Sequence, residues 1–229
     1  MHVPDGFLDA PTSVATGVVA ASAVAVSLLG ARRELDDRTA PMAGLVATFV
    51  FAAQMINFPV GAGTSGHLMG GALAAVFVGP WTAVLCLSVV LVVQALLMAD
   101  GGVTALGTNI TVIGIVTVVV GWGVFVILRR LLPSRTSLVA PAAAVAALVS
   151  VPAAALAFTG LFAVGGNAPV DMGAVLTAML GWHTVIGIGE AVVTGLVVKS
   201  VIAARPDLVH GARPLLVERR LETRTALPL

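Results

Sequence analysis

Long apolar runs make up most of this chain, and only short polar segments separate them. A helix needs about 20 predominantly apolar residues to cross the hydrocarbon core of a bilayer. The runs predict spanning helices at about 12–31, 40–58, 81–98, 108–128, 137–161 and 174–203, and a shorter helix at about 68–78 before Gly79-Pro80. The predicted fold class is therefore an all-α polytopic membrane protein with about seven transmembrane helices.

Composition supports this class. Of 229 residues, 59% are hydrophobic and 10% are charged, and the mean hydropathy is +1.07, whereas soluble domains carry about 25% charged residues. The single cysteine, Cys86, excludes a disulfide framework and a thiolate metal site. No basic segment precedes the first apolar run, so we expect no cleaved signal peptide and expect Met1 to stay the first residue.

The basic residues predict the orientation. If the N-terminus faces outside, all twelve Lys and Arg residues fall on the inner side, as the bias toward basic cytoplasmic loops requires. These residues are Arg32, Arg33, Arg38, Arg129, Arg130, Arg135, Lys199, Arg205, Arg213, Arg219, Arg220 and Arg224. We therefore predict an outer N-terminus, one transmembrane metal-binding domain over 1–203, and a polar cytoplasmic tail over 204–229 in which His210 is solvated.

The first two residues can chelate a metal ion. The amine of Met1, the amide of His2 and the imidazole of His2 offer three nitrogens that close two adjoining chelate rings. Nitrogen donors in one plane suit Ni(II), Cu(II) or low-spin Co(II) and do not suit Ca²⁺ or Mg²⁺. The predicted topology places His67, in a glycine-rich segment, on the same outer side as a possible fourth donor; the alternative is a structural histidine at a helix start.

Other polar residues lie near the same side or within the last span. Asn57, Ser65 and Asn109 are candidates to orient the imidazoles by accepting their second ring proton, although helix capping is an alternative for each. His183 and Glu190 share a face of the last span. An ionisable residue inside a membrane faces the bundle interior, so Glu190 belongs either to a structural polar network or to the transport machinery.

Four segments of the chain resemble the CbiM/NikM family. They are MHVPDGFL at 1–8, NFPV at 57–60, GTSGHLMGG at 63–71 and ADGG at 99–102. This family comprises the substrate-binding membrane (S) components of energy-coupling factor importers for cobalt and nickel. The resemblance implies a six-helix S-component-like core with an added N-terminal helix. It also implies a square-planar metal site made by the amine of Met1, the amide and imidazole of His2, and the imidazole of His67.

The resemblance further implies the partners and the location. We expect a transmembrane coupling (T) protein, two ATP-binding subunits and a separate small CbiN/NikN-type membrane subunit as partners. We expect this chain to lie in the plasma membrane of a prokaryote, where cobalt uptake would serve cobalamin biosynthesis. Ni²⁺ or Co²⁺ would be the substrate, with no prosthetic group and no nucleic acid partner, and the sequence does not choose between the two metals.

Two other functions stay open from the residues alone. A stand-alone secondary carrier or channel for a divalent transition metal is the main alternative, and a membrane metal sensor is the other. The chain has no Gly-x-x-x-x-Gly-Lys-Ser/Thr motif, so we expect it not to hydrolyse ATP and not to be an enzyme.

Overall fold

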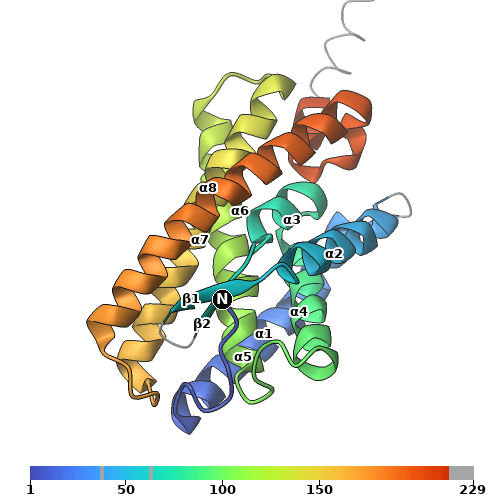
Figure 1. The fold of residues 1–229 in the computed structure, drawn as a ribbon. Helices are drawn as coiled ribbons and strands as arrows, with labels where there is room; N and C mark the ends of the chain where they lie inside the picture. Colours follow the sequence, from blue (N-terminus) through green and yellow to red (C-terminus); the bar gives the residue numbers. More distant parts are fainter. Residues whose placement is uncertain (37–38, 62–63, 217–229) are drawn as a thin grey trace, which may run out of the picture.

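The computed structural model describes residues 1–36, 39–61 and 64–216 (Figure 1). The expectations for Arg38, Arg219, Arg220 and Arg224 lie outside these residues. The helices are α1 (Ala10–Glu34), α2 (Ala40–Gln54), α3 (Gly71–Val78), α4 (Pro80–Leu97), α5 (Leu106–Asn109), α6 (Thr117–Leu131), α7 (Val139–Gly165) and α8 (Met172–Ala204). Two strands, β1 (Phe58–Gly61) and β2 (Thr64–Gly66), pair antiparallel.

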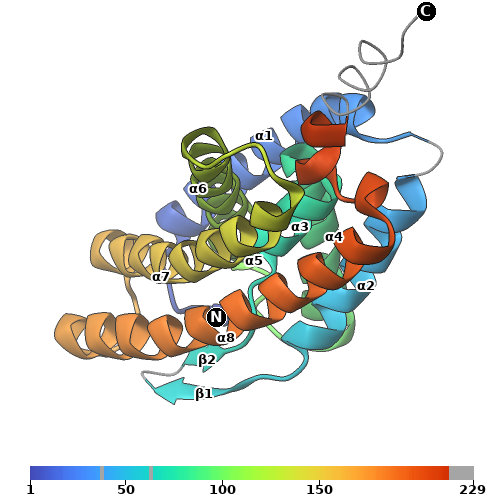
Figure 2. The same cartoon turned by 90° about the horizontal axis from the view of Figure 1, so that it is seen from above.

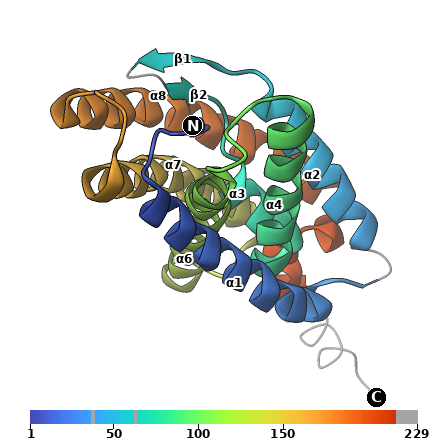
Figure 3. The same cartoon turned by 90° about the horizontal axis from the view of Figure 1, so that it is seen from below.

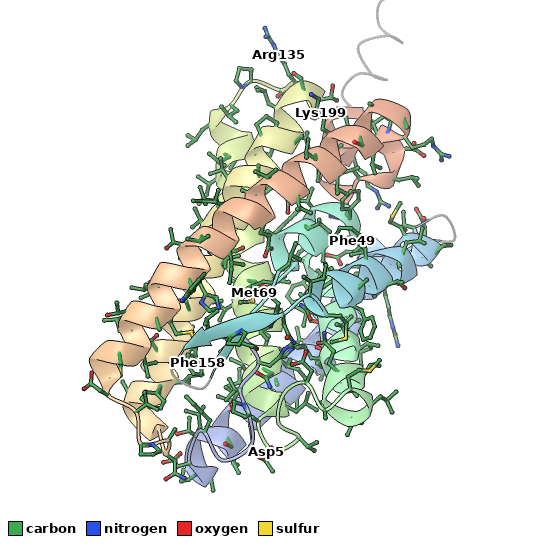
Figure 4. All side chains as sticks on the ribbon, viewed as in Figure 1. Asp5, Phe49, Met69, Arg135, Phe158 and Lys199 are labelled. Carbon is green, nitrogen blue, oxygen red and sulfur yellow. The ribbon has the colours of Figure 1, made fainter. Side chains whose placement is uncertain are left out.

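Among the described residues, five helices are long and apolar enough to cross a membrane. They are Ala10–Glu34, Pro80–Leu97, Leu106–Leu131, Thr136–Gly165 and Met172–Ala204. The third of these is continuous because a π-helix, Ile110–Val116, joins α5 to α6. The helical membrane-protein class predicted from the sequence is confirmed, whereas the number of crossings and their orientation stay predictions. Figure 4 shows Arg135 and Lys199 at one end of the bundle and Asp5 at the other.

The hairpin β1–β2 replaces the end of the predicted second span. The sequence suggested a helix to about residue 58, but α2 ends at Gln54. Pro59 lacks a backbone N–H and glycines weaken a helix, so this segment forms backbone hydrogen bonds across the hairpin. Figure 2 shows the hairpin beside α8, with which both strands are in contact.

The centre of the bundle is α3, a helix of eight residues that are all buried. Helices α2, α4, α6 and α7 contact it, and Figure 3 shows α3 enclosed while α1 crosses the opposite side of the bundle from α8. Helices α7 and α8 pack side by side along their length. Because α3 is short and fully buried, its position in the bundle fixes where the chain segments before and after it lie.

Part of the segment after α8 packs on the bundle, although Arg205 and Asp207 are exposed. Two 3-10 turns, Pro206–Leu208 and His210–Ala212, fold it back onto the bundle, and Val209 is fully buried. The expectation that His210 is solvated is wrong: its ring lies 5.6 Å from that of Trp122, and burial lowers its pKa to about 4. Val209, Ala212 and Leu215 are three residues apart and buried, so this segment packs on the bundle through its apolar side chains. Residues 217–229 lie outside the described residues.

Candidate metal site

Residues 1–9 precede α1, and the N-terminus lies in the middle of the bundle (Figure 1). Asp9 caps α1 by accepting a hydrogen bond from the backbone N–H of Thr12 at 2.9 Å. The ring of Phe7 packs against Phe158 and Phe162 of α7, with centroids 5.8 and 5.3 Å apart. These contacts fix the direction in which the N-terminal segment enters.

Val3 is held on both sides of its backbone. Its N–H donates to Asn109 Oδ1 at 2.8 Å, and its carbonyl accepts from Asn109 Nδ2 at 3.1 Å and from the N–H of Gly102 at 2.8 Å. Gly102 lets the loop lie this close, because a Cβ there would come within 2.4 Å of the backbone nitrogen of Asp5. The amide of Asn109 therefore fixes the position of the two residues before Val3.

The amine of Met1 contacts the imidazole of His67, and both residues are almost fully buried. Nδ1 of His67 lies 2.8 Å from the carbonyl oxygen of Leu68. Because a carbonyl can only accept, Nδ1 carries the proton and Nε2 presents its lone pair toward the amine. This is the tautomer that a metal bound at Nε2 requires.

His2 lies against His67, with ring centroids 4.3 Å apart. Its Nε2 donates to Gln94 Oε1 at 3.2 Å, and its Nδ1 lies 3.0 Å from Asp100 Oδ1 without meeting hydrogen-bond geometry. Its backbone N–H has only a long contact, 3.5 Å, to Ser65 Oγ. Two of its nitrogens, the amide and Nδ1, are therefore buried and only weakly engaged.

Burial also favours the unprotonated forms of these groups. Desolvation lowers the pKa of the Met1 amine well below its usual value, and the nearby Asp100 carboxylate opposes this only in part. Desolvation likewise lowers the pKa of His2, against the opposing effect of Asp100. Near neutral pH both groups then have lone pairs free for an electrophile such as a metal ion.

The segment that follows His67 is held by two other helices. Glu190 of α8 accepts hydrogen bonds from the N–H groups of Met69 at 2.7 Å and Gly70 at 2.9 Å. Gln54 of α2 donates to the carbonyl of Met69 at 2.8 Å. His183 of α8 is fully buried, its Nδ1 donates to the carbonyl of Met179 at 2.8 Å, and its Nε2 has no hydrogen-bond partner.

The structure brings together Met1, His2 and His67, and their role as metal ligands stays a prediction. Ser65, Asn57 and Asn109 also lie around them, but none of the three accepts a ring proton. Asn57 instead donates to Asp100 Oδ2 at 3.0 Å.

The acceptors for the ring protons are Gln94 and the carbonyl of Leu68, which sequence reasoning missed. A glutamine inside an otherwise apolar span was the available signal for Gln94. For Asp100 the signal was the ADGG segment at 99–102, which did not show that its carboxylate faces His2.

Within the described ranges, no three His, Cys, Asp or Glu side chains converge as they would in a side-chain metal cage. A metal at this position would therefore be bound by two imidazoles together with main-chain nitrogens. Such a donor set differs from the oxygen-rich sites of Ca²⁺ and from the thiolate sites of structural zinc.

A family model described as the cobalt uptake substrate-specific transmembrane region, CbiM, matches residues 2–208. The chain belongs to the CbiM family. A putative metal transport protein of Haloquadratum walsbyi is 39% identical over 91% of this chain and 93% of the relative. A putative fused nickel transport protein, NikMN, of Archaeoglobus fulgidus is 37% identical over 92% of this chain and 68% of the relative.

Two solved structures share the fold. A truncated transition metal transporter superposes with a TM-score of 0.82 at 30% identity, covering 89% of this chain and 99% of the other. A second transition metal transporter gives a TM-score of 0.80 at 31% identity, covering 88% and 92%. CbiM proteins are metal transport components and not enzymes, so the predicted family, the predicted absence of an enzyme activity and the multi-pass membrane location are confirmed.

Proposed function

We propose that this CbiM protein is the substrate-specific component of an energy-coupling factor importer for Ni²⁺ or Co²⁺. The observation that supports this most directly is the meeting of Met1, His2 and His67 in a buried place. The four donors would be the Met1 amine, the His2 amide, His2 Nδ1 and His67 Nε2. Planar nitrogen sets of this kind suit Ni(II) and low-spin Co(II).

The weakly engaged atoms of His2 fit this role. A buried polar atom without a hydrogen-bond partner is rare and calls for an explanation. His2 Nδ1 is such an atom, and it faces the carboxylate of Asp100 at 3.0 Å. A cation bound at Nδ1 would be attracted by that carboxylate, which makes the contact favourable.

The carboxylate of Asp100 would also balance the charge of the bound metal ion. A divalent cation that displaces the His2 amide proton leaves the four-nitrogen site with one net positive charge. Burying an uncompensated charge costs several kcal/mol, and Asp100, whose side chain is 15% exposed, supplies the opposite charge. The Asp100 side chain, more exposed than that of His2, would also offer an arriving cation its first anionic contact.

Transport itself would depend on partners. We expect a coupling (T) protein and two ATP-binding subunits to drive release of the metal on the inner side. The Archaeoglobus relative is named as a fused NikMN protein, and this chain aligns with 68% of it. That name supports a small CbiN/NikN-type subunit as a further partner. Uptake that continues without the ATP-binding subunits would favour the secondary-carrier alternative instead.

The experiment that tests the site adds two glycines before Met1, because a single one would place His2 third in the chain and create a new chelating sequence. The extension converts the amine of Met1 into an amide and moves the free amine away from His67, so we expect the purified protein in detergent to lose most of its Ni²⁺ and Co²⁺ binding in a calorimetric titration. The matched control adds two glycines after Leu229 and keeps wild-type binding. Equal binding by the two variants would exclude the amine as a ligand.

A further inference from the structure

Glu190 has a buried carboxylate that is not a ligand in the proposed metal site. It is 1% exposed in the middle of α8, and both of its oxygens accept backbone hydrogen bonds. Carboxylates so far from water are costly unless they are fully hydrogen-bonded. The question is what its two bonds hold in place.

The first bond reaches His67 through a single peptide group. His67 Nδ1 donates to the carbonyl of Leu68 at 2.8 Å, and the N–H of that same peptide group, on Met69, donates to Glu190 Oε2 at 2.7 Å. The peptide bond is planar and trans, so fixing its N–H also fixes the direction of its carbonyl. The carboxylate thus determines where the His67 ring finds its acceptor.

The second bond steadies the next peptide group in the same way. The N–H of Gly70 donates to Glu190 Oε1 at 2.9 Å, while the carbonyl of that peptide group, on Met69, accepts from Gln54 Nε2 at 2.8 Å. Gly70 has a φ of +81° and packs so tightly that a Cβ would lie 2.8 Å from the Val50 side chain. Glu190 of α8 therefore holds two successive peptide groups, and Gln54 of α2 holds the second of them from the other side.

We infer that Glu190 is a positioning residue for His67, acting through the peptide group between Leu68 and Met69, with Gln54 as its counterpart. The inference rests on the proposed function, because it assumes that His67 Nε2 binds the metal. Carboxylates that accept a proton from a metal-bound imidazole orient the ring and increase its basicity. Here one polarisable peptide group is inserted between carboxylate and imidazole.

This arrangement also joins α8 to the metal site. Glu190 and the fully buried His183 lie on the same helix, and the β1–β2 hairpin that precedes His67 contacts that helix too. Figure 4 shows Met69 at the centre of the bundle, between the hairpin and α8. A displacement of α8 relative to α2 would therefore change the orientation of His67.

The test compares Glu190→Gln with Glu34→Gln in the full chain in detergent. Glu34 is a matched control because it is also buried and also accepts two backbone N–H bonds at a helix start, from Trp81 at 3.2 Å and Thr82 at 2.7 Å. Affinity for Ni²⁺ and Cu²⁺ is measured by titration, the visible absorption band of bound Cu²⁺ reports the number of nitrogen donors, and thermal melting reports the fold.

We expect Glu190→Gln to weaken metal affinity about tenfold or more, as loss of such supporting groups does, and to move the absorption band to longer wavelength. Glu34→Gln should lower the melting temperature and leave affinity and band unchanged. Wild-type affinity and an unshifted band in Glu190→Gln would overturn the inference. A wild-type chain that binds no metal would instead contradict the proposed function.

Should Glu190→Gln not fold, Gln54→Met decides the question. It removes the hydrogen bond to the Met69 carbonyl with little change in volume, and we expect the same direction of change in affinity and in the band. A folded Gln54→Met protein with wild-type affinity and spectrum would overturn the inference.

Discussion

The two ends of α3 have the same construction but different surroundings. At the beginning of α3, Glu190 accepts hydrogen bonds from the N–H groups of Met69 and Gly70. At its other end, Glu34 accepts hydrogen bonds from the N–H groups of Trp81 and Thr82, at the start of α4. Each end also has a glycine in the left-handed region, with φ of +81° at Gly70 and +90° at Gly79.

The two ends differ in what the hydrogen bonds of each carboxylate connect to. At the Glu190 end the hydrogen bonds continue through a peptide group to His67 and the nitrogens around it. At the Glu34 end they stop at the first turn of α4, and Arg213 donates to the backbone carbonyl of Glu34 at 3.3 Å. Identical capping chemistry can thus serve binding at one end and stability at the other.

The largest expected effect is at the Glu190 end. His67→Ala removes one of four proposed donors, and because changes to supporting groups alone already cost about 10–100-fold, we expect metal affinity to fall on the order of 100-fold or more. His210→Ala, which removes an imidazole near the other end of α3, is the control and should keep wild-type affinity. A titration in which both variants bind alike would remove His67 from the site.

A smaller loss is expected for Asp100→Asn. The change keeps the shape of the side chain but removes the charge that would balance the bound cation, so we expect about tenfold weaker binding of Ni²⁺. Asp171→Asn is the control, because Asp171 caps α8 by accepting from the N–H of Ala174 and touches none of the donors. Equal affinities would show that Asp100 does not compensate the metal's charge.

Acidification should weaken binding, because protons compete for the same nitrogens as the metal. The pKa values of Met1 and His2 are lowered by burial, so both stay unprotonated to lower pH than free groups do. Release of the His2 amide proton makes affinity fall with pH throughout, and protonation of the Met1 amine and the His2 imidazole adds a steeper loss only as the pH falls through their lowered pKa values. We expect this steeper loss to begin at lower pH than in a peptide of residues 1–7. Coincident pH profiles for protein and peptide would contradict this.

The smallest effect on metal affinity, with the clearest effect on stability, is expected at the Glu34 end. In Gly79→Ala a Cβ would lie 2.4 Å from the Glu34 carboxyl carbon, at a φ unfavourable for alanine. We expect the free energy of unfolding to fall by about 2–4 kcal/mol and affinity to stay at the wild-type level. Gly123→Ala, whose Cβ would meet nothing within 4 Å, lies inside α6, where alanine favours the helix over glycine; in melting and titration experiments it should leave affinity unchanged and not lower the free energy of unfolding.

Much of the helix pattern could be predicted. The expected span at about 81–98 corresponds to Pro80–Leu97 and that at about 174–203 to Met172–Ala204, because Gly-Pro pairs and polar loops interrupt otherwise apolar runs. The β1–β2 hairpin and the docking of Val209 were not predicted. Short segments of this kind are stabilised by the surfaces they pack against, and those surfaces are absent from a local pattern.

The candidate site was only partly predictable for a related reason. A transmembrane helix is apolar on all sides, so its periodicity does not show which face is turned inward. The sequence could place His2 and His67 on one side of the membrane but could not show that Gln94, Asp100 and Glu190 meet them there.

By itself, the sequence determined that this is a helical membrane protein of the CbiM family whose first residues can chelate a metal. Local chemistry and the length of apolar runs suffice for that, because both are properties of neighbouring residues. Only the tertiary structure decided which polar groups surround the amine of Met1 and that a carboxylate on α8 supports His67. Those contacts join residues from 66 to 121 positions apart, and packing of the whole bundle creates them.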